Sequence, residues 1–328
     1  RWPGLVYVVL SNLTETGGAN IGEQNRLRDI RIEWQCYDTI ANGGLGNELG
    51  LPSDTHIIGR DANPISCAYR ILTDPAWSVN LGDINFANFQ AAAAVCATEG
   101  IGFSMLVDNE TEAFELLNII EKHIDGYFGP NPTNGLMEVI LARSGYDPAL
   151  EFQADESNIV EVKNWAKNEW PQTKNEVKIR FVNRDKNYGD DHAVAQDMAG
   201  RLIAGRPQSV TTRYPGVRTA AAANAIVART ARAYFWPVIK FEMELDRTAW
   251  ELRPGSVVVV NYEDIGAVDM PCRVNRLRMG DPVKQTIKVD VVEDVFAYET
   301  GIQAQPQPSE DVAPSVTPVA VSSYYKVY

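Results

Sequence analysis

The strongest constraint on the fold of this chain is a series of alternating segments in its C-terminal third. Phe241, Met243 and Leu245 alternate with charged residues, and the same period of two recurs at 270–275 and 287–292. Alternation of this kind places successive side chains on opposite faces of a strand. The segments therefore predict antiparallel strands with one buried face and one face toward water.

A turn and an alanine-rich segment accompany these strands. Pro254-Gly255 is typical of a turn and leads into an apolar strand at 256–260. Upstream, residues 219–234 are rich in alanine and predict a long helix. No catalytic motif occurs between 214 and 296, which favours a non-catalytic role for this stretch.

Periodicity predicts further elements. A helix over 86–98 has Asn85 as its N-cap, and a helix over 110–123 starts with a capping box of Asn109 and Glu112. Weaker helical patterns cover 157–170 and 192–202. The other predictions are a helix at 64–73, strands at 5–10, 30–36, 103–107 and 176–182, and a hairpin joining 127–128 to 136–141.

The composition excludes some classes of function. The formal net charge of −13 argues against a general nucleic-acid binder, because such proteins need a basic surface to neutralise phosphates. No apolar run is long enough to cross a membrane. The four cysteines lack the spacing of a zinc or redox motif, and we expect free, buried thiols.

Motifs that could carry chemistry are weak. Gly44-Leu45-Gly46 lacks the spacing of a phosphate-binding loop, and no nucleophile motif is present. Asp190-Asp191-His192 could supply metal ligands, but Asp residues that lead into a helix are more often N-caps. We therefore predict no metal site, no cofactor and no catalytic residue.

Three acidic residues, Glu242, Glu244 and Asp246, fall on one side of a predicted strand. A glycoside hydrolase needs only two facing carboxylates, so an enzyme site here is an alternative. The strict alternation with apolar residues instead favours a solvated strand face, because antiparallel sheets commonly expose one side to water.

The order of several short segments resembles the tail hub proteins of long-tailed bacteriophages, also called tip attachment or host specificity proteins, with relatives in prophages and gene transfer agents. No single segment is specific, but the order matches that of the family over about residues 25–300. The segments are 63–75, 86–97, 115–120, 125–128 (Asp-Gly-Tyr-Phe), 175–179, 195–197, 214–217 (Tyr-Pro-Gly-Val), 252–255 (Leu-Arg-Pro-Gly), 272–274 (Cys-Arg-Val) and 293–296 (Glu-Asp-Val-Phe). Where the family usually has Asp, this chain has Ser256.

The resemblance implies a structural protein of the virion tail tip. Such baseplate hubs form homotrimers, in which each subunit contributes two tube-like β-barrel domains and presents pseudo-sixfold symmetry to a hexameric ring. The implied partners are the distal tail protein or tail tube ring, the tape measure protein and the tail fibre or receptor-binding parts, with DNA present only in transit. Neither catalysis nor a cofactor is implied.

Residue patterns and resemblance together predict an α+β, multi-domain chain with antiparallel β-barrel-like tube domains and an inserted small α+β module. If Glu242, Glu244 and Asp246 line the tail channel, their like charge would let DNA slide past. A tail-tip depolymerase and a receptor-binding module are the alternative functions. The expected divisions are an N-terminal β segment (1–60), the inserted α+β module (61–145), a β segment with helices (146–235), a C-terminal barrel-like domain (236–300) and a Pro-rich linker to a further region (301–328).

Overall fold

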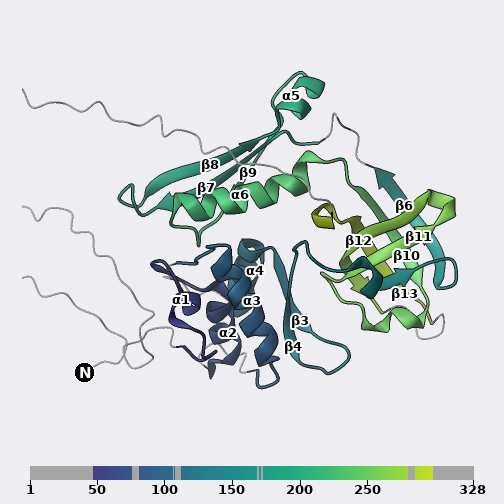
Figure 1. Ribbon diagram of the computed structural model, residues 1–328, viewed down its shortest axis with the longest axis horizontal. Helices are drawn as coiled ribbons and strands as arrows, with labels where there is room; N and C mark the ends of the chain where they lie inside the picture. Colours follow the sequence, from purple (N-terminus) through teal and green to yellow (C-terminus); the bar gives the residue numbers. More distant parts are fainter. Residues whose placement is uncertain are drawn as a thin grey trace, which may run out of the picture.

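The computed structural model describes residues 47–75, 81–105, 107, 112–167, 170, 173–279 and 285–297. The strands predicted at 5–10 and 30–36, the Gly44-Leu45-Gly46 loop and the linker at 301–328 lie outside these residues. Within them the chain is α+β, with three separate hydrophobic cores (Figure 1).

The first core belongs to an α+β module formed by residues 47–142. Its helices pack on one another and on a hairpin, shown in purple and blue in Figure 1. The predicted helices at 64–73 and 86–98 and the hairpin are all present. The elements are α1 (Ser53–His56), β1 (Ile57–Ile58), β2 (Asp61–Ala62), α2 (Pro64–Thr73), α3 (Phe86–Thr98), α4 (Ala113–Ile124), β3 (Gly126–Pro130) and β4 (Met137–Leu141).

Asparagine side chains fix how these helices begin and pack. Asn63 accepts a hydrogen bond from the Ile65 amide at 3.0 Å as the cap of α2, and its amide donates to the Ala93 carbonyl of α3 at 2.9 Å. Asn85 caps α3 as predicted, by accepting from the Asn88 amide at 3.2 Å. Capping thus also joins neighbouring elements.

Two predictions for this module need correction. The strand expected over 103–107 is absent from the residues described there, and only Phe103 forms an isolated bridge, to Ala62. Helix α4 begins at Ala113, with Glu112 as an N-cap that makes no side-chain cap bond. Asn109, the other half of the predicted capping box, lies outside the described residues.

The second core lies between a three-stranded sheet and the alanine-rich helix, which we call together the helix-backed sheet. Strand β7 (Glu176–Asn183) is central, with β8 (Gly189–Gln196) antiparallel on one side and β9 (Ser209–Arg213) parallel on the other. Helix α6 (Ala220–Phe235) lies against one face, and the short helix α5 (Met198–Ala204) stands beyond the end of the sheet (Figure 1).

The helix predicted over 192–202 is wrong in its first half. Residues up to Gln196 belong to β8, because Ala193 and Ala195 pair with β7 and are buried in the core beneath α6. The helical part begins only at Met198, after Asp197 caps it by accepting from the Ala199 amide. Tertiary pairing therefore overrides the local helical preference of alanine here.

The third core is enclosed by a six-stranded sheet that curls into a half-barrel (Figure 1, right). Its order is β5-β11-β12-β13-β10-β6, and all neighbours are antiparallel except β5 and β11. The strands are β5 (Phe152–Ala154), β6 (Ile159–Lys167), β10 (Ile239–Leu245), β11 (Val257–Tyr262), β12 (Ala267–Arg278) and β13 (Ile287–Glu293), with 3₁₀ turns at Pro148–Leu150, Arg247–Glu251, Glu263–Ile265 and Val295–Ala297.

The alternation in the C-terminal third is confirmed, since Phe241, Met243 and Leu245 are all buried in the half-barrel core. The helix predicted over 157–170 is wrong, because 159–167 form edge strand β6. Its alternation is interrupted near Asn164, which has a left-handed φ of 53° at an irregularity in the pairing with β10. The six-stranded sheet contains β5 and β6 from before residue 235 and four strands from after it. The five expected domain limits stay predictions.

A close backbone approach at Gly216 provides a test of the packing between module and helix-backed sheet. A Cβ atom there would lie 2.3 Å from the ring of Phe103, and the Gly216 carbonyl accepts from the Ser104 amide at 2.9 Å. We expect Gly216→Ala to lower the free energy of unfolding by about 1–3 kcal/mol, as overpacking does.

Chemical denaturation measures this change, with Gly82→Ala as the matched control because no atom lies within 4 Å of its added Cβ. Equal stability of the two variants would contradict the packing described at Phe103.

Candidate functional site: the arginine junction

The C-terminal end of α4 is the point at which other parts of the chain converge on the module. The helix ends at Ile124, and Asp125 follows with a left-handed φ of 45°. The last carbonyls of a helix have no amide donors within the helix and carry the negative end of its dipole. Such an end attracts cationic hydrogen-bond donors, and two arginines occupy it here.

Arg229 reaches this end from α6. Its guanidinium donates to the His123 carbonyl at 2.8 Å and to the Asp125 carboxylate at 2.5 Å, and it lies 3.4 Å from the Glu99 carboxylate. The Arg229 side chain is only 9% exposed, whereas its partners Glu99 and Asp125 are 28% and 30% exposed, so these ion pairs are partly shielded from water. Arg229 therefore ties the helix-backed sheet to the module.

Arg143 occupies the same end from the segment that leaves β4 for the half-barrel. It donates to the Ile124 carbonyl at 2.8 Å and forms a bidentate ion pair with the Glu99 carboxylate, at 2.5 and 2.8 Å. Glu99 thus accepts from arginines of two different segments. We call Arg143, Arg229, Arg253 and Arg273, with their acidic partners, the arginine junction.

Arg253 and Arg273 extend the junction into the half-barrel. Arg253, just before the Pro254-Gly255 turn, donates to Glu138 of β4 at 2.6 Å. Arg273 of β12 donates to Asp294 at 2.6 Å and to the Arg143 carbonyl at 3.3 Å. Arg253 therefore joins the half-barrel to the module by a charge-assisted hydrogen bond, and Arg273 binds the segment that connects them, at the Arg143 carbonyl.

The environment of Glu138 shows how strongly the junction favours ionised carboxylates. Burial alone would raise its pKa, but donors from Asn85, Arg253 and Asn131 outweigh this and lower the pKa to about 2. Asp294 is likewise buried and accepts from the Tyr146 hydroxyl at 3.0 Å, and the pKa of Tyr146 is raised by burial and by that carboxylate.

A further ion pair connects the far end of the helix-backed sheet to the module. Arg184, which follows β7, pairs with Asp61 of β2, and both side chains are less than 10% exposed. Nearby, a Cβ on Gly102 would lie 2.5 Å from the Asp61 side chain, so the backbone passes close to this pair. The module is thus held to the helix-backed sheet at two separated points.

His123 lies inside this contact region as a neutral side chain. It is 1% exposed, its Nε2 lies 3.0 Å from the Gly102 carbonyl, and its ring meets Phe103 edge-on at 5.1 Å. Burial lowers its pKa to about 4, although the hydrogen bond to Gly102 acts in the opposite direction. A charged imidazolium is therefore unfavourable between module and helix-backed sheet.

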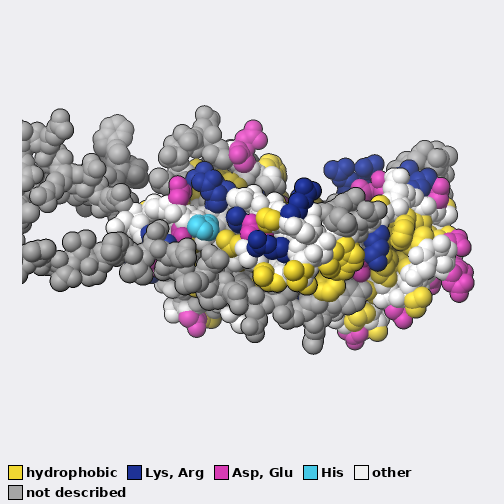
Figure 2. Space-filling view, turned by 90° about the horizontal axis from the view of Figure 1, so that it is seen from above, with side chains coloured by type: hydrophobic (Ala, Val, Ile, Leu, Met, Phe, Trp, Pro, Cys, Tyr) yellow, Lys and Arg dark blue, Asp and Glu magenta, His cyan; other side chains and the backbone are white. Residues whose placement is uncertain are grey.

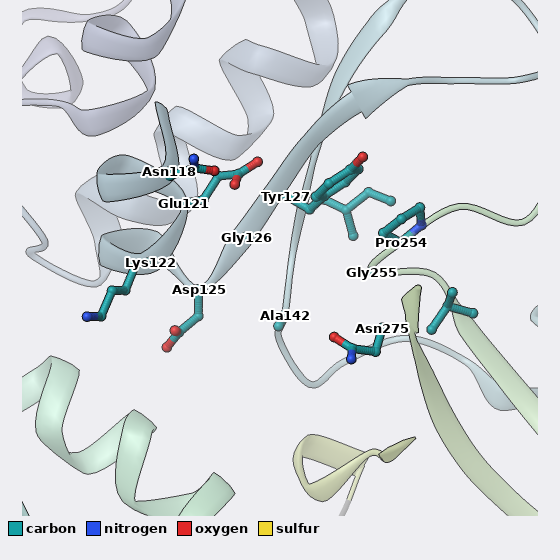
Figure 3. A pocket seen from close by; sticks show the side chains of 12 residues that line it. Asn118, Glu121, Lys122, Asp125, Gly126, Tyr127, Ala142, Pro254, Gly255 and Asn275 are labelled. Atoms are coloured by element: carbon teal, nitrogen blue, oxygen red, sulfur yellow. The ribbon is translucent and has the colours of Figure 1, made fainter. Parts of the chain in front are cut away.

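A pocket of about 450 Å³ opens beside the junction, between α4 and β3 on one side and the Pro254-Gly255 turn and β12 on the other (Figure 3). Both of its carboxylates are engaged in holding the chain together. Glu121 accepts from the Phe128 amide at 2.8 Å, and Asp125 pairs with Arg229. The pocket therefore offers no free pair of carboxylates for acid–base chemistry.

The structure separates the acidic residues that the sequence placed together. Glu242 and Glu244 share the outer face of β10, but Asp246 lies beyond the strand and caps the 3₁₀ turn by accepting from the Thr248 amide. Glu244 lies 2.9 Å from Lys288 and 3.3 Å from Lys163. The outer face therefore carries both signs of charge, and its orientation toward a channel stays a prediction.

The other candidate groups are built into the fold. Asp190, Asp191 and His192 all lie in β8, so they cap no helix, and Asp191 accepts from Asn183 at 2.7 Å. Cys67, Cys96 and Cys272 are free thiols, and burial raises the pKa of Cys96 to about 12. No described group of three or more His, Cys, Asp and Glu side chains could hold a metal ion. In the same residues, no helix combines the length and apolarity needed to span a membrane.

The sequence singled out several segments that contribute to the arginine junction, but it did not predict that they lie together. Several segments that carry the family resemblance supply the junction, namely those with Asp125, Arg253, Arg273 and Asp294. Local patterns alone did not assign these residues a role, because their partners lie far away in sequence. Arg143 and Glu99 were not singled out by any motif.

The pH dependence of stability tests the placement of His123. Between pH 6.5 and 4 the unfolded chain binds a proton at this residue and the folded chain does not, so stability falls as the pH falls. We expect His123→Gln to remove about 2–3 kcal/mol of this pH dependence, since one pKa unit is about 1.4 kcal/mol.

Denaturation at several pH values between 7 and 4 measures the effect, with the exposed His192 as the control in His192→Gln. That control should retain the wild-type profile. An unchanged profile for His123→Gln would contradict a buried, neutral imidazole.

Comparison with known proteins shows similarity to phage tail proteins over part of this chain. No curated protein matches it. Three solved structures are similar at low identity. They are a protein of the "Virion of native gene transfer agent (GTA) particle" (15% identity, TM-score 0.45, covering 68% of this chain and 49% of that one), the 43 kDa tail protein of prophage MuSo2 from Shewanella oneidensis (16%, 0.40, 68% and 73%) and a tail protein from Neisseria meningitidis MC58 (15%, 0.42, 66% and 68%).

The chain spans about half the length of the gene transfer agent protein. Residues 134–277 match the model of the family described as "Putative phage tail protein". This range begins just before β4 and ends within β12. It includes five residues of the arginine junction, namely Glu138, Arg143, Arg229, Arg253 and Arg273. The resemblance to phage tail proteins is thereby confirmed for this part of the chain.

Proposed function

We propose that this chain is a structural subunit of the phage tail tip, a baseplate hub that assembles as a homotrimer. In this role it connects the tail tube or distal tail ring to the host-recognition apparatus and gates the DNA channel. Its neighbours would be the distal tail protein or tube ring, the tape measure protein and the tail fibre or receptor-binding parts.

The half-barrel is the observation that carries this proposal. Its six-stranded sheet ends in β5 and β6, and neither edge has a further strand partner among the described residues. An unpaired edge exposes a row of amide and carbonyl groups, which stable proteins cover or pair. A subunit of a closed ring pairs such surfaces with its neighbours, so an open barrel suits an assembly role.

The arginine junction supports the same role. Connecting two parts of a particle requires a subunit that transmits force without separating internally. Arg143, Arg229 and Arg253 join the module to the other parts through partly shielded ion pairs, and Arg273 donates to the Arg143 carbonyl. Breaking a buried pair typically costs about 3–5 kcal/mol, so these contacts resist separation.

The state of Glu244 argues against a glycosidase site on the outer face of β10. A glycosidase needs one carboxylic acid with a raised pKa as proton donor. Glu244 has instead a lowered pKa, because Lys288 and Lys163 donate hydrogen bonds to it. The Glu244 carboxylate is therefore kept ionised by lysines, as expected for a solvated sheet face.

Cryo-electron microscopy of the parent particle tests the proposal. We expect three copies of the half-barrel around the tail axis at the tip, and their absence from particles that lack this chain. Copies stacked along the tube shaft, or absent from the tail, would contradict a hub role. As a control, Glu242→Gln with Glu244→Gln should leave assembly intact and change no polysaccharide hydrolysis by the particle.

A further inference from the structure

We propose that α5 is a docking knob that binds the acidic end of the half-barrel on a second copy of this chain. The inference rests on the proposed role as a ring subunit and names the two surfaces that meet. It follows from an exposed apolar helix, from the separation of charge along the chain and from the positions of the two surfaces.

Helix α5 exposes an unusual group of large apolar side chains. Met198 is 63% exposed, Leu202 83% and Ile203 60%, and all three lie within one seven-residue helix. Figure 1 shows the helix beyond the end of the helix-backed sheet, away from the cores. Exposed apolar groups gathered in this way mark interaction sites, whereas isolated ones are common.

The helix is held in place and is not a loose loop. Asp197 caps it, and the Asp197 amide donates to the Asn175 carbonyl at 2.9 Å. The Asn175 side chain donates to the Arg206 carbonyl at 3.0 Å and accepts from the Gln208 amide at 2.7 Å, which fixes the segment that returns to β9. A preorganised knob loses little conformational freedom on binding.

Charge is strongly separated along this chain. Residues 198–241 contain no Asp or Glu, although the whole chain has a net charge of −13. Arg201 and Arg206 are exposed beside the apolar side chains of α5. The nearby Glu176 is already paired with Lys178 at 2.8 Å and accepts from Gln196. The knob therefore has an apolar centre with a cationic rim. Figure 2, which looks from above, shows Lys and Arg side chains over this side of the molecule.

The half-barrel carries the complementary surface. Residues 144–162 and 254–272 contain no Lys or Arg. At the turn between β11 and β12, Glu263, Asp264 and Asp269 are exposed around Val268, which is 75% exposed. The pKa of Tyr262 is raised by desolvation and by the negative charges of Asp264 and Glu156. Glu156 therefore lies close to this turn. We call these four acids with Val268 the acidic end.

The knob and the acidic end fit a contact between copies. An apolar centre with a rim of opposite charge is the usual anatomy of a specific interface. The two surfaces differ from one another, so each copy uses its knob on one neighbour and its acidic end on the other. Such head-to-tail contacts build rings when the rotation closes. Charge complementarity favours a second copy of this chain over DNA as the partner. The DNA phosphates would be attracted to the cationic knob only, whereas a second copy also provides a partner for the acidic end.

Self-association of the purified chain, followed by sedimentation and light scattering across protein concentration, tests this contact. Arg201→Glu with Arg206→Glu should weaken association at least about tenfold, as charge reversal across an interface does. Glu263→Lys with Asp264→Lys should have the same effect, and combining all four substitutions in one chain should restore association. Leu202→Ser should weaken it about tenfold or more.

Matched controls are Lys240→Glu, on the outer face of β10, and Phe114→Ser, which replaces an apolar side chain that is 69% exposed on α4. Both should associate like the wild type, and circular dichroism should show that every variant folds. A monomeric wild type at all concentrations, or knob variants that associate normally, would overturn the inference.

These outcomes separate the inference from the hub proposal. Association that ignores the knob refutes only the inference, because the particle reconstruction decides the hub role independently. Association through the knob with a mass other than that of a trimer supports the inference and contradicts a trimeric hub.

Discussion

Arginine ion pairs at the C-terminal end of α4 are the constraint on which the rest of the structure depends. The described residues contain three distinct hydrophobic cores, and Ile101 of the module packs into the core of the helix-backed sheet. Arg229 from α6 and Arg143 from the exit of β4 both donate to carbonyls at this helix end. The free carbonyls of this helix end and the carboxylates of Glu99 and Asp125 thus bind arginines from the helix-backed sheet and from the segment that leads to the half-barrel.

The arginine junction joins the three parts of the described chain. The module sits at the junction, where the half-barrel is fixed through Arg253 and Arg273 and the helix-backed sheet through Arg229 and Arg184. The module carboxylates Asp125 and Glu138 pair with two of these arginines, Arg229 and Arg253. The exposed features of the described chain, the open sheet edges and α5, lie outside the junction.

The sequence predicted those elements whose local pattern agrees with their environment. Strand β10 alternates because one face is buried, whereas β6 lies at an edge with an irregularity at Asn164 and has no clear period. In β8, alanines that favour a helix are held in a strand by pairing with β7. The junction escaped prediction because Arg229 and Asp125 are 104 residues apart, and no local pattern reports such a contact.

Differential scanning calorimetry of the wild type and of Arg143→Ala with Arg229→Ala tests this account most directly. If the junction joins the three cores, the wild type unfolds in one cooperative transition, and the double variant shows separate transitions at lower temperature. Separate transitions in the wild type, unchanged by the two substitutions, would contradict the claim that these arginines make the chain one mechanical unit.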